Sequence, residues 1–295
     1  MQLIDFSQKL NEPIVVCLGY FGCMHKGHVA LLEKAKLRAS ECGAKVALFT
    51  FSNNHLRVLG KDANVLYTFD ERLALYESLG ADYVLAAEFT DAFRSLTGAE
   101  FVQQLKKFNL KGVVCGFDYT YGADRHTSDD LAKALAGICS VDVVAPVCWQ
   151  GKKVSTTLIR QLLAENQLAL ANELLSEPFF VVGNVVSGRK VGAKIGFPTA
   201  NIQVDSDKLL PTGVFGGKVL LNGVPYKCIV NVGDKPTFGD ASATVEAHLI
   251  GFEGDLYGRN LKVSLTKFLR NITKFESANE LALQLRSDME NVLND

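Results

Sequence analysis

Two histidines stand three residues apart at the end of the first strongly apolar segment of the chain. They are His25 and His28, with Gly27 between them, and Gly19 and Phe21 come just before. Imidazoles can donate hydrogen bonds to a phosphate that gains charge in a transition state, and a glycine allows close approach to the backbone. The spacing predicts a phosphate site. Two partly exposed histidines at a helix start, with no chemical role, are the alternative.

A second group of side chains suited to phosphate comes much later in the sequence. Ser155 and Thr156 open a segment with helical spacing, and Arg160 follows at helical distance. Hydroxyls and N–H groups at a helix start, with an arginine nearby, suit the β- and γ-phosphates of a nucleotide. Ser155 as a helix cap and Arg160 on a solvated face are the alternative. Together the two groups resemble the nucleotidyltransferase superfamily.

A glycine-rich, basic segment forms the third candidate. It contains Gly188, Gly192 and Gly196 and ends in Thr199 and Asn201. Glycines let a backbone wrap phosphates, and hydroxyl and amide oxygens are ligands for the Mg²⁺ that accompanies ATP. The pattern is not a Walker A loop. Taken alone, it is more often a surface turn.

A carboxylate on an expected strand is the fourth candidate. Glu246 shares one face of residues 244–249 with Thr244 and His248, because side chains alternate along a strand. A glutamate there can take the proton from an attacking hydroxyl, which is typically worth about 10²–10⁴-fold in rate. The tight polar loop that begins at Asn231 precedes it. A solvated outer face of the sheet is the alternative.

The elements that must position these groups change in character along the chain. Up to about residue 175, buried apolar runs alternate with segments of helical spacing, which is typical of an α/β domain with a parallel sheet covered on both faces. The expected strands are 14–21, 45–51, 83–87, 112–117 and 141–147. The expected helices are 29–42, 69–79, 99–108, 129–136 and 157–175.

The second part of the chain predicts a small antiparallel β-barrel with a C-terminal helix. The expected strands are 180–186, 214–221, 226–232, 244–252 and 261–268, and the expected helix is 278–293. Asn222-Gly223 between two strands is a strong hairpin signal, and Ser277 with Glu280 predicts a capping box. We therefore expect two domains, residues 1–176 and 177–295.

Composition and charge exclude several classes of protein. The chain has 18 basic and 19 acidic residues up to Ser176 and 13 of each after it, so neither part has the basic excess of a nucleic-acid-binding domain. We expect no secretory signal and no membrane helix, because the required apolar segments are missing. The seven cysteines are scattered and never spaced C-x-x-C, which indicates a reducing, cytoplasmic location. The sequence does not determine the oligomeric state.

The chain resembles the bacterial bifunctional riboflavin kinase/FAD synthetases over essentially its whole length. In the first part, the resemblance lies in His25-Lys26-Gly27-His28, Gly116-Phe117-Asp118 and residues 155–160. In the second part, it lies in residues 196–201, 231–233, 236–238, 245–248 and 255–258. The order of the second set is highly specific for this family.

This resemblance implies two activities with ATP, Mg²⁺ and flavins. The C-terminal barrel would phosphorylate riboflavin to FMN, with Thr199 and Asn201 at the Mg-ATP positions and Glu246 as the base for the ribityl hydroxyl. The N-terminal domain would transfer AMP from ATP to FMN, giving FAD and pyrophosphate, with His25 and His28 as its catalytic residues. The further nucleotide- and flavin-binding residues expected are Gly19, Phe21, Gly27, Gly116, Asp118, Ser155, Thr156, Arg160, Gly188, Gly192, Gly196, Pro198 and Asn231.

The first domain departs from the family's usual residues, and this leaves alternatives open. Gly22-Cys23 replaces the usual Asp-Gly, and Asn53-Asn54 stands in the run that normally carries an acidic residue and Pro-His-Pro. The main hypothesis is a bifunctional enzyme. A monofunctional riboflavin kinase with an impaired N-terminal domain is the second, and a flavin-binding regulatory protein is a distant third.

Overall fold

The chain forms two compact units, which are described separately. The computed structural model describes residues 1–61, 64–188, 192, 196–233 and 244–294. The units are Met1–Thr156 and Thr157–Asp295. The division falls after Thr156, the first residue of α7 (Thr156–Ala164), so the rest of α7 and α8 (Leu168–Leu174) belong to the second unit, whereas the sequence predicts them in the first domain. In the second unit, Asn172 of α8 donates a hydrogen bond to the Leu265 carbonyl. The predicted boundary at 176/177 stays a prediction.

A six-stranded parallel sheet is the centre of the first unit. Its strand order is β1-β4-β3-β2-β5-β8, and every neighbouring pair is parallel. The strands are β1 Gln2–Asp5, β2 Pro13–Leu18, β3 Lys45–Phe51, β4 Tyr83–Ala87, β5 Asn109–Gly116 and β8 Ser140–Val144. Two short hairpins, β6 (Thr120–Tyr121) with β7 (His126–Thr127) and β9 (Cys148–Trp149) with β10 (Lys152–Lys153), complete the strands. The predicted α/β class is confirmed.

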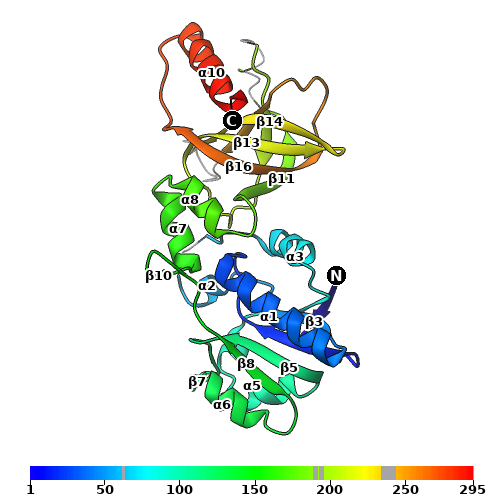
Figure 1. Ribbon diagram of the computed structural model, residues 1–295. Helices are drawn as coiled ribbons and strands as arrows, with labels where there is room; N and C mark the ends of the chain where they lie inside the picture. Colours follow the sequence, from blue (N-terminus) through cyan, green and yellow to red (C-terminus); the bar gives the residue numbers. More distant parts are fainter. Residues whose placement is uncertain (62–63, 189–191, 193–195, 234–243, 295) are drawn as a thin grey trace. The chain divides into compact units, whose positions relative to one another are not determined.

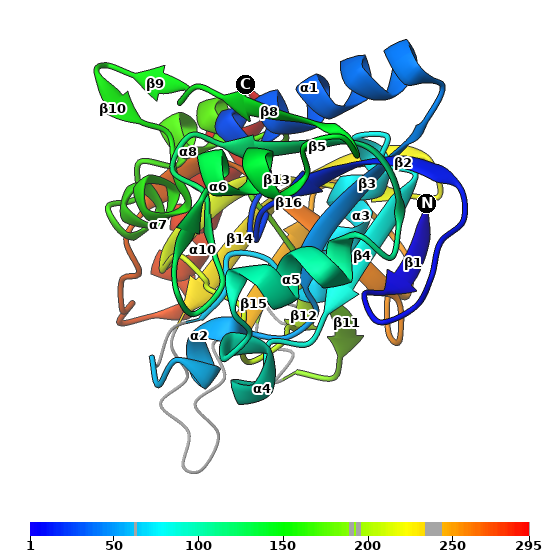
Figure 2. The ribbon, with the colours of Figure 1, turned by 90° about the horizontal axis from the view of Figure 1, so that it is seen from below.

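Helices cover both faces of this sheet. The long helix α1 (Lys26–Cys42) lies over one face, and Gly112 of β5 approaches the side chains of its Arg38 and of Val15. The other face buries Ile14 and Val16 in a core shared with α5 and α6. Figure 2 shows α1 and α5 on opposite sides of the strands. The remaining helices are α2 His55–Val58, α3 Phe69–Ser78, α4 Asp91–Arg94, α5 Gly98–Leu105 and α6 Ser128–Ala134.

The strand order reverses between β2 and β5, which makes this position the topological switch point of the sheet. From β2 the chain adds β3 and β4 on one side, where β1 forms the edge, and then β5 and β8 on the other side. In such sheets ligands bind outside the carboxyl ends of the strands at this switch point. Gly19 follows the end of β2, and Gly116 ends β5. The fold thus brings two of the predicted binding residues to one edge.

The second unit is a closed antiparallel barrel with a helix packed against it. The strand order around the barrel is β11-β12-β15-β14-β13-β16. The strands are β11 Phe180–Val186, β12 Ala200–Gln203, β13 Gly213–Leu221, β14 Val224–Gly233, β15 Thr244–Leu249 and β16 Asn260–Arg270. Helix α10 (Ala278–Leu293) lies alongside β13 and β14 (Figure 1), where Val292 packs on Val214 and Ile229. The predicted barrel and terminal helix are confirmed.

The structure differs from the sequence expectations at four points. The predicted single helix 157–175 is two helices, because Asn166 adopts a left-handed φ of 55° and interrupts the helical backbone. Strand β1 was missed because an edge strand buries only one of its four residues, Ile4. Strand β12 was missed because its four residues follow the glycine-rich segment directly. At Ser277, the hydroxyl caps Glu280 N–H, but the Glu280 carboxylate accepts from Glu276 N–H, so the capping box forms only in part.

A buried ion pair fastens α10 to the barrel. Arg270 Nη2 donates to Asp288 Oδ2 at 2.8 Å, Gln284 donates to Oδ1 at 2.9 Å, and the Asp288 side chain is only 2% exposed. Replacing Asp288 leaves a largely buried guanidinium without its partner. Such losses cost about 3–5 kcal/mol when the pair is fully buried, and we expect about 2–4 kcal/mol here because Arg270 is 20% exposed.

The change that tests this pair is Asp288→Asn. Scanning calorimetry of the full chain should show the loss of stability in the transition of the second unit alone. Glu290→Gln, an exposed position on the same helix, is the matched control and should change stability by less than about 0.5 kcal/mol. Equal stability of Asp288→Asn and the control would show that the pair contributes nothing.

Candidate active sites

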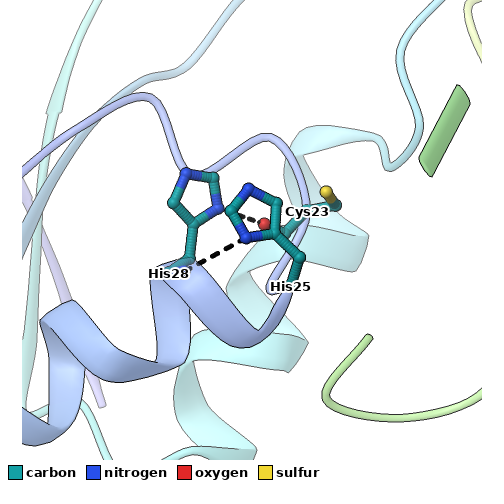
Figure 3. Close-up of side chains that lie close together, drawn as sticks. All are labelled: Cys23, His25 and His28. Atoms are coloured by element: carbon teal, nitrogen blue, oxygen red, sulfur yellow. Dashed lines mark hydrogen bonds between the residues drawn. The ribbon is translucent and has the colours of Figure 1, made fainter. Parts of the chain in front are cut away.

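The histidine pair lies at the first turn of α1, directly after the end of β2. His25 is the N-cap residue, and its Nδ1 accepts a hydrogen bond from the His28 backbone N–H at 3.2 Å. His28 Nδ1 in turn contacts the Cys23 carbonyl oxygen. The two rings stack with their centroids 3.8 Å apart, as Figure 3 shows. His25 and His28, three residues apart in sequence, therefore form a pair of imidazoles that contacts with the backbone hold in place.

Burial makes both imidazoles neutral. It lowers the pKa of His25 to about 2 and of His28 to about 4, and the Lys153 ammonium adds to both effects. A neutral imidazole carries one N–H: in His25 it is on Nε2 and can donate to an anionic oxygen, whereas in His28 it is on Nδ1 and faces the Cys23 carbonyl. The positive end of α1 and the charge of Lys153 favour an anion at the same place. The pair is thus suited to stabilising phosphate charge.

The same pKa shifts predict how the first unit responds to acid. Unfolded histidines titrate near 6.5, so between pH 6.5 and pH 4 the unfolded state binds more protons than the folded state. We therefore expect the stability of the first unit to fall as the pH drops through this range, and to fall less in His28→Gln. Urea unfolding, monitored by the fluorescence of Trp149, the single tryptophan of the chain, reports the stability of this unit alone. Identical pH slopes for both proteins would contradict the prediction.

The structure brings only part of the second predicted group, Ser155, Thr156 and Arg160, close to the histidine pair. Thr156, the last residue of the first unit, has its Oγ1 3.7 Å from Cys23 Sγ. Gly27 lies beside the Val154 carbonyl, next to Ser155, and a side chain there would also press on the His25 ring. Arg160 belongs to the second unit, and its role stays a prediction.

Next to the switch point lies a cavity of about 1000 Å³ with aromatic walls. Gly19 and Asp118 line it, and their role in binding stays a prediction. Gly116 lies just behind, with Asp118 Oδ1 3.5 Å from where its Cβ would be. The predicted residue Phe21 does not line it, because its ring is fully buried against His28. The aromatic and histidine side chains of the lining are Tyr20, Phe49, Phe51, His55, Phe89, Phe93, Phe101, Tyr119 and Tyr121.

A buried arginine that the sequence analysis missed supports the loop after β2. Arg72 on α3 is 2% exposed, and its guanidinium donates to Thr50 Oγ1 and to the Phe51 carbonyl, both at 2.8 Å. Tyr76, one turn further along, donates to the Phe21 carbonyl at 2.8 Å. The signal available in the sequence was a lone arginine among the apolar positions of the predicted helix 69–79. These contacts fix the backbone that leads to the histidine pair.

In the second unit, three predicted residues lie in one row across adjacent strands. Glu246 on β15 is paired directly with Asn201 on β12 and with Asn231 on β14. Directly opposite residues on one face of a sheet have Cβ atoms about 4.5–5.5 Å apart. Val245 and Ala247 on either side of Glu246 are fully buried, which confirms the predicted alternation at these positions. The row places a carboxylate between two amides.

Two cavities meet at the start of β12. Asn231, Glu246 and His248 line the first, of about 240 Å³, together with residues 272–275 and α10. Pro198 lines the second, of about 150 Å³, together with Asp255-Leu256-Tyr257. Thr199 lines both. A group transferred from a ligand in one cavity to a ligand in the other would therefore pass Thr199, beside the row of Asn201 and Glu246.

The glycines of this segment serve close packing. A Cβ at Gly188 would lie 2.1 Å from the Asn201 amide nitrogen, and one at Gly192 would lie 2.2 Å from the Phe197 carbonyl oxygen. Gly196 has a φ of 85°, which suits glycine. His248 Nδ1 lies 2.8 Å from the Pro198 carbonyl and holds the same segment on β15. The basic residues of this segment and the motif at 236–238 lie outside the described residues.

Comparison with known proteins identifies the family. Residues 7–158 match the family model for FAD synthetase, and residues 175–294 match the model for riboflavin kinase. The chain is 33% identical to the bifunctional riboflavin kinase/FMN adenylyltransferase of Bacillus subtilis (strain 168), over 95% of this chain and 91% of that protein. It is 34% identical to the protein of the same description from Escherichia coli (strain K12), over 96% and 93%. The chain belongs to the bifunctional riboflavin kinase/FMN adenylyltransferase family.

A solved structure matches this member of the family over its full length. It is described as a macrolide-efflux protein from Streptococcus pneumoniae, is 30% identical, and superposes with a TM-score of 0.91 over 100% of this chain and 99% of that one. Among the described residues of the chain, no helix has the length and apolar character needed to cross a membrane.

Proposed function

We propose that the chain converts riboflavin to FMN in its second unit and FMN to FAD in its first, with ATP as the donor in both steps. Family membership over nearly the whole chain supports both activities. The observation that carries the kinase step is the row of Asn201, Glu246 and Asn231, of which Glu246 and Asn231 line a cavity that shares Thr199 with a second one. Small molecules are the partners, and we expect a cytoplasmic location.

For the kinase step, we assign the larger cavity to riboflavin and the smaller one to ATP. The larger cavity has apolar walls from Phe197, Ile229 and Leu285, which suit a flat ring system, and Glu246 stands at its polar side. Glu246 takes the proton of the ribityl 5′-hydroxyl while that oxygen attacks the γ-phosphorus of ATP. The bond from this phosphorus to the β-bridging oxygen breaks, and ADP leaves.

Magnesium fits the residues at this junction. Thr199 offers a hydroxyl, Asn201 an amide oxygen and Glu246 a carboxylate, and these hard oxygen donors are the kind that Mg²⁺ prefers. The Asn201 amide packs closely on Gly188, where a Cβ would lie 2.6 Å from its oxygen. We propose Thr199 and Asn201 as the residues that hold Mg²⁺. When bound, it neutralises charge on the ATP phosphates.

For the adenylyltransferase step, we assign the histidine pair to the ATP phosphates and the aromatic cavity to the flavin. The FMN phosphate oxygen attacks the α-phosphorus of ATP, the bond to the α,β-bridging oxygen breaks, and pyrophosphate leaves. His25 donates a hydrogen bond from Nε2 to the phosphate oxygens as their charge grows, and His28 donates from Nε2 once the negative charge of ATP favours a second proton on its ring. Gly27 lets these oxygens approach the start of α1, where the backbone N–H groups add to the stabilisation.

The experiment that tests both activities is a product analysis. The purified chain is incubated with ATP, Mg²⁺ and either riboflavin or FMN, and the flavins are separated by chromatography, with oxidised and with chemically reduced flavin. We expect FMN and FAD from riboflavin, and FAD from FMN. FMN alone under both conditions would make the chain a riboflavin kinase with an impaired N-terminal domain. No product would overturn both assignments.

A further inference from the structure

The loop before α1 brings together three side chains that commonly bind metal ions. Cys23, His25 and His28 each offer one ligand atom, and within the described part of the chain these atoms lie within 4.8 Å of one another. Cys23 and His25 are buried and His28 is half-buried. Figure 3 shows the three side chains projecting from one loop and the first turn of one helix.

The chemistry of this cluster differs from that of a magnesium site. One thiol and two imidazoles form a soft to borderline donor set, which selects zinc and similar transition metals, whereas Mg²⁺ prefers oxygen ligands. His28 Nδ1 faces the Cys23 carbonyl oxygen, which can only accept, so neutral His28 offers Nε2 to an ion in the way usual for a metal-binding histidine. His25 Nδ1 accepts from the His28 backbone N–H, so His25 must release this contact and move its proton from Nε2 to Nδ1 before Nε2 binds an ion.

Small side-chain rotations complete the site. Neighbouring ligand atoms around a tetrahedral Zn²⁺ lie roughly 3.3–3.6 Å apart, so the cluster must contract by about 1 Å and the stacked rings must turn toward each other. The Cys23 thiol loses its proton to solvent as the sulfur–metal bond forms. The resulting thiolate offsets the positive charge that Lys153 contributes at the histidines. A water or a phosphate oxygen can take the fourth position.

We propose that Cys23, His25 and His28 form a binding site for a thiophilic divalent transition-metal ion such as Zn²⁺. Because the ion occupies the two imidazoles assigned to the ATP phosphates, it blocks FAD formation and leaves FMN formation intact. This consequence rests on the proposed function, whereas the metal site itself does not.

Cobalt spectroscopy tests the site directly. The full-length, metal-free chain is titrated with Co²⁺, and the near-ultraviolet charge-transfer band of a thiolate bound to cobalt is recorded. We expect the band to saturate at one ion per chain, to disappear on addition of Zn²⁺ and to be absent in Cys23→Ser. Cys42→Ser, which changes an exposed cysteine on α1, is the matched control and should retain the band.

An activity measurement tests the consequence. We expect Zn²⁺ to inhibit FAD formation with a half-inhibitory concentration at least tenfold higher in Cys23→Ser than in the unmodified chain. FMN formation in the same mixture should be unaffected. A missing cobalt band in the unmodified chain, or an unchanged band in a folded Cys23→Ser protein, would overturn the site. The absorption result holds whether or not the chain forms FAD, so failure of the proposed function is recognised separately.

Discussion

Glu246→Gln should reduce FMN formation from riboflavin by about 10²–10⁴-fold, which is the usual contribution of a general base. Glutamine keeps the shape of the side chain and its place opposite Asn201 and Asn231 but cannot accept the hydroxyl proton. The loss should therefore fall on kcat, with little change in the KM for riboflavin. Steady-state FMN formation, measured by flavin chromatography, gives both constants.

The specificity of this effect has a clear control. Glu253→Gln changes an exposed glutamate in the same unit that lines neither cavity and should keep normal FMN formation. FAD formation from supplied FMN should be normal in both variants, because the histidine pair is unchanged. Near-normal FMN formation by Glu246→Gln would show that another group accepts the proton.

His28→Ala should reduce FAD formation from FMN by about 10²–10³-fold, the cost of removing one preorganised donor from a site of charge development. The substitution removes one of the two stacked rings and the contact with the Cys23 carbonyl. The rate of FAD formation from FMN and ATP, followed by chromatography, measures the effect. FMN formation from riboflavin should be unchanged.

Glu33→Ala, at an exposed position on the same helix, controls for general damage to α1. It should form FAD at the normal rate. The fluorescence of Trp149 during urea unfolding shows whether His28→Ala still folds. Equal losses of FMN and FAD formation in a folded His28→Ala protein would contradict two separate sites.

The sequence predicted the elements that have a strong local signal. Continuous apolar runs became the central strands β2, β3, β4 and β5, because a strand buried on both faces must be apolar throughout. Asn222-Gly223 forms the predicted turn between β13 and β14, and both residues adopt positive φ. The partnership of Glu246 and Asn201 was only a hypothesis from the resemblance, and the strand register supplies its geometry.

Features that depend on distant packing were not predictable from local patterns. The role of Arg72 appears only when Thr50 and Phe51 of β3 lie beside α3. The break at Asn166 lies within a run whose apolar spacing continues on both sides. The steric reason for a glycine at position 22 is visible only in the structure, because a Cβ there would lie 2.4 Å from the Tyr20 ring. A larger side chain at position 22 would therefore require the Tyr20 ring to move.

We expect the two successive reactions to take place at independent sites, and a mixing experiment tests this independence most directly. Glu246→Gln, His28→Ala and an equimolar mixture of the two variants are each incubated with riboflavin, ATP and Mg²⁺. Neither variant alone should form appreciable FAD. The mixture should form it, because the His28→Ala chain releases FMN that the Glu246→Gln chain adenylylates. A mixture that forms no FAD, although the unmodified chain does, would contradict two independent sites.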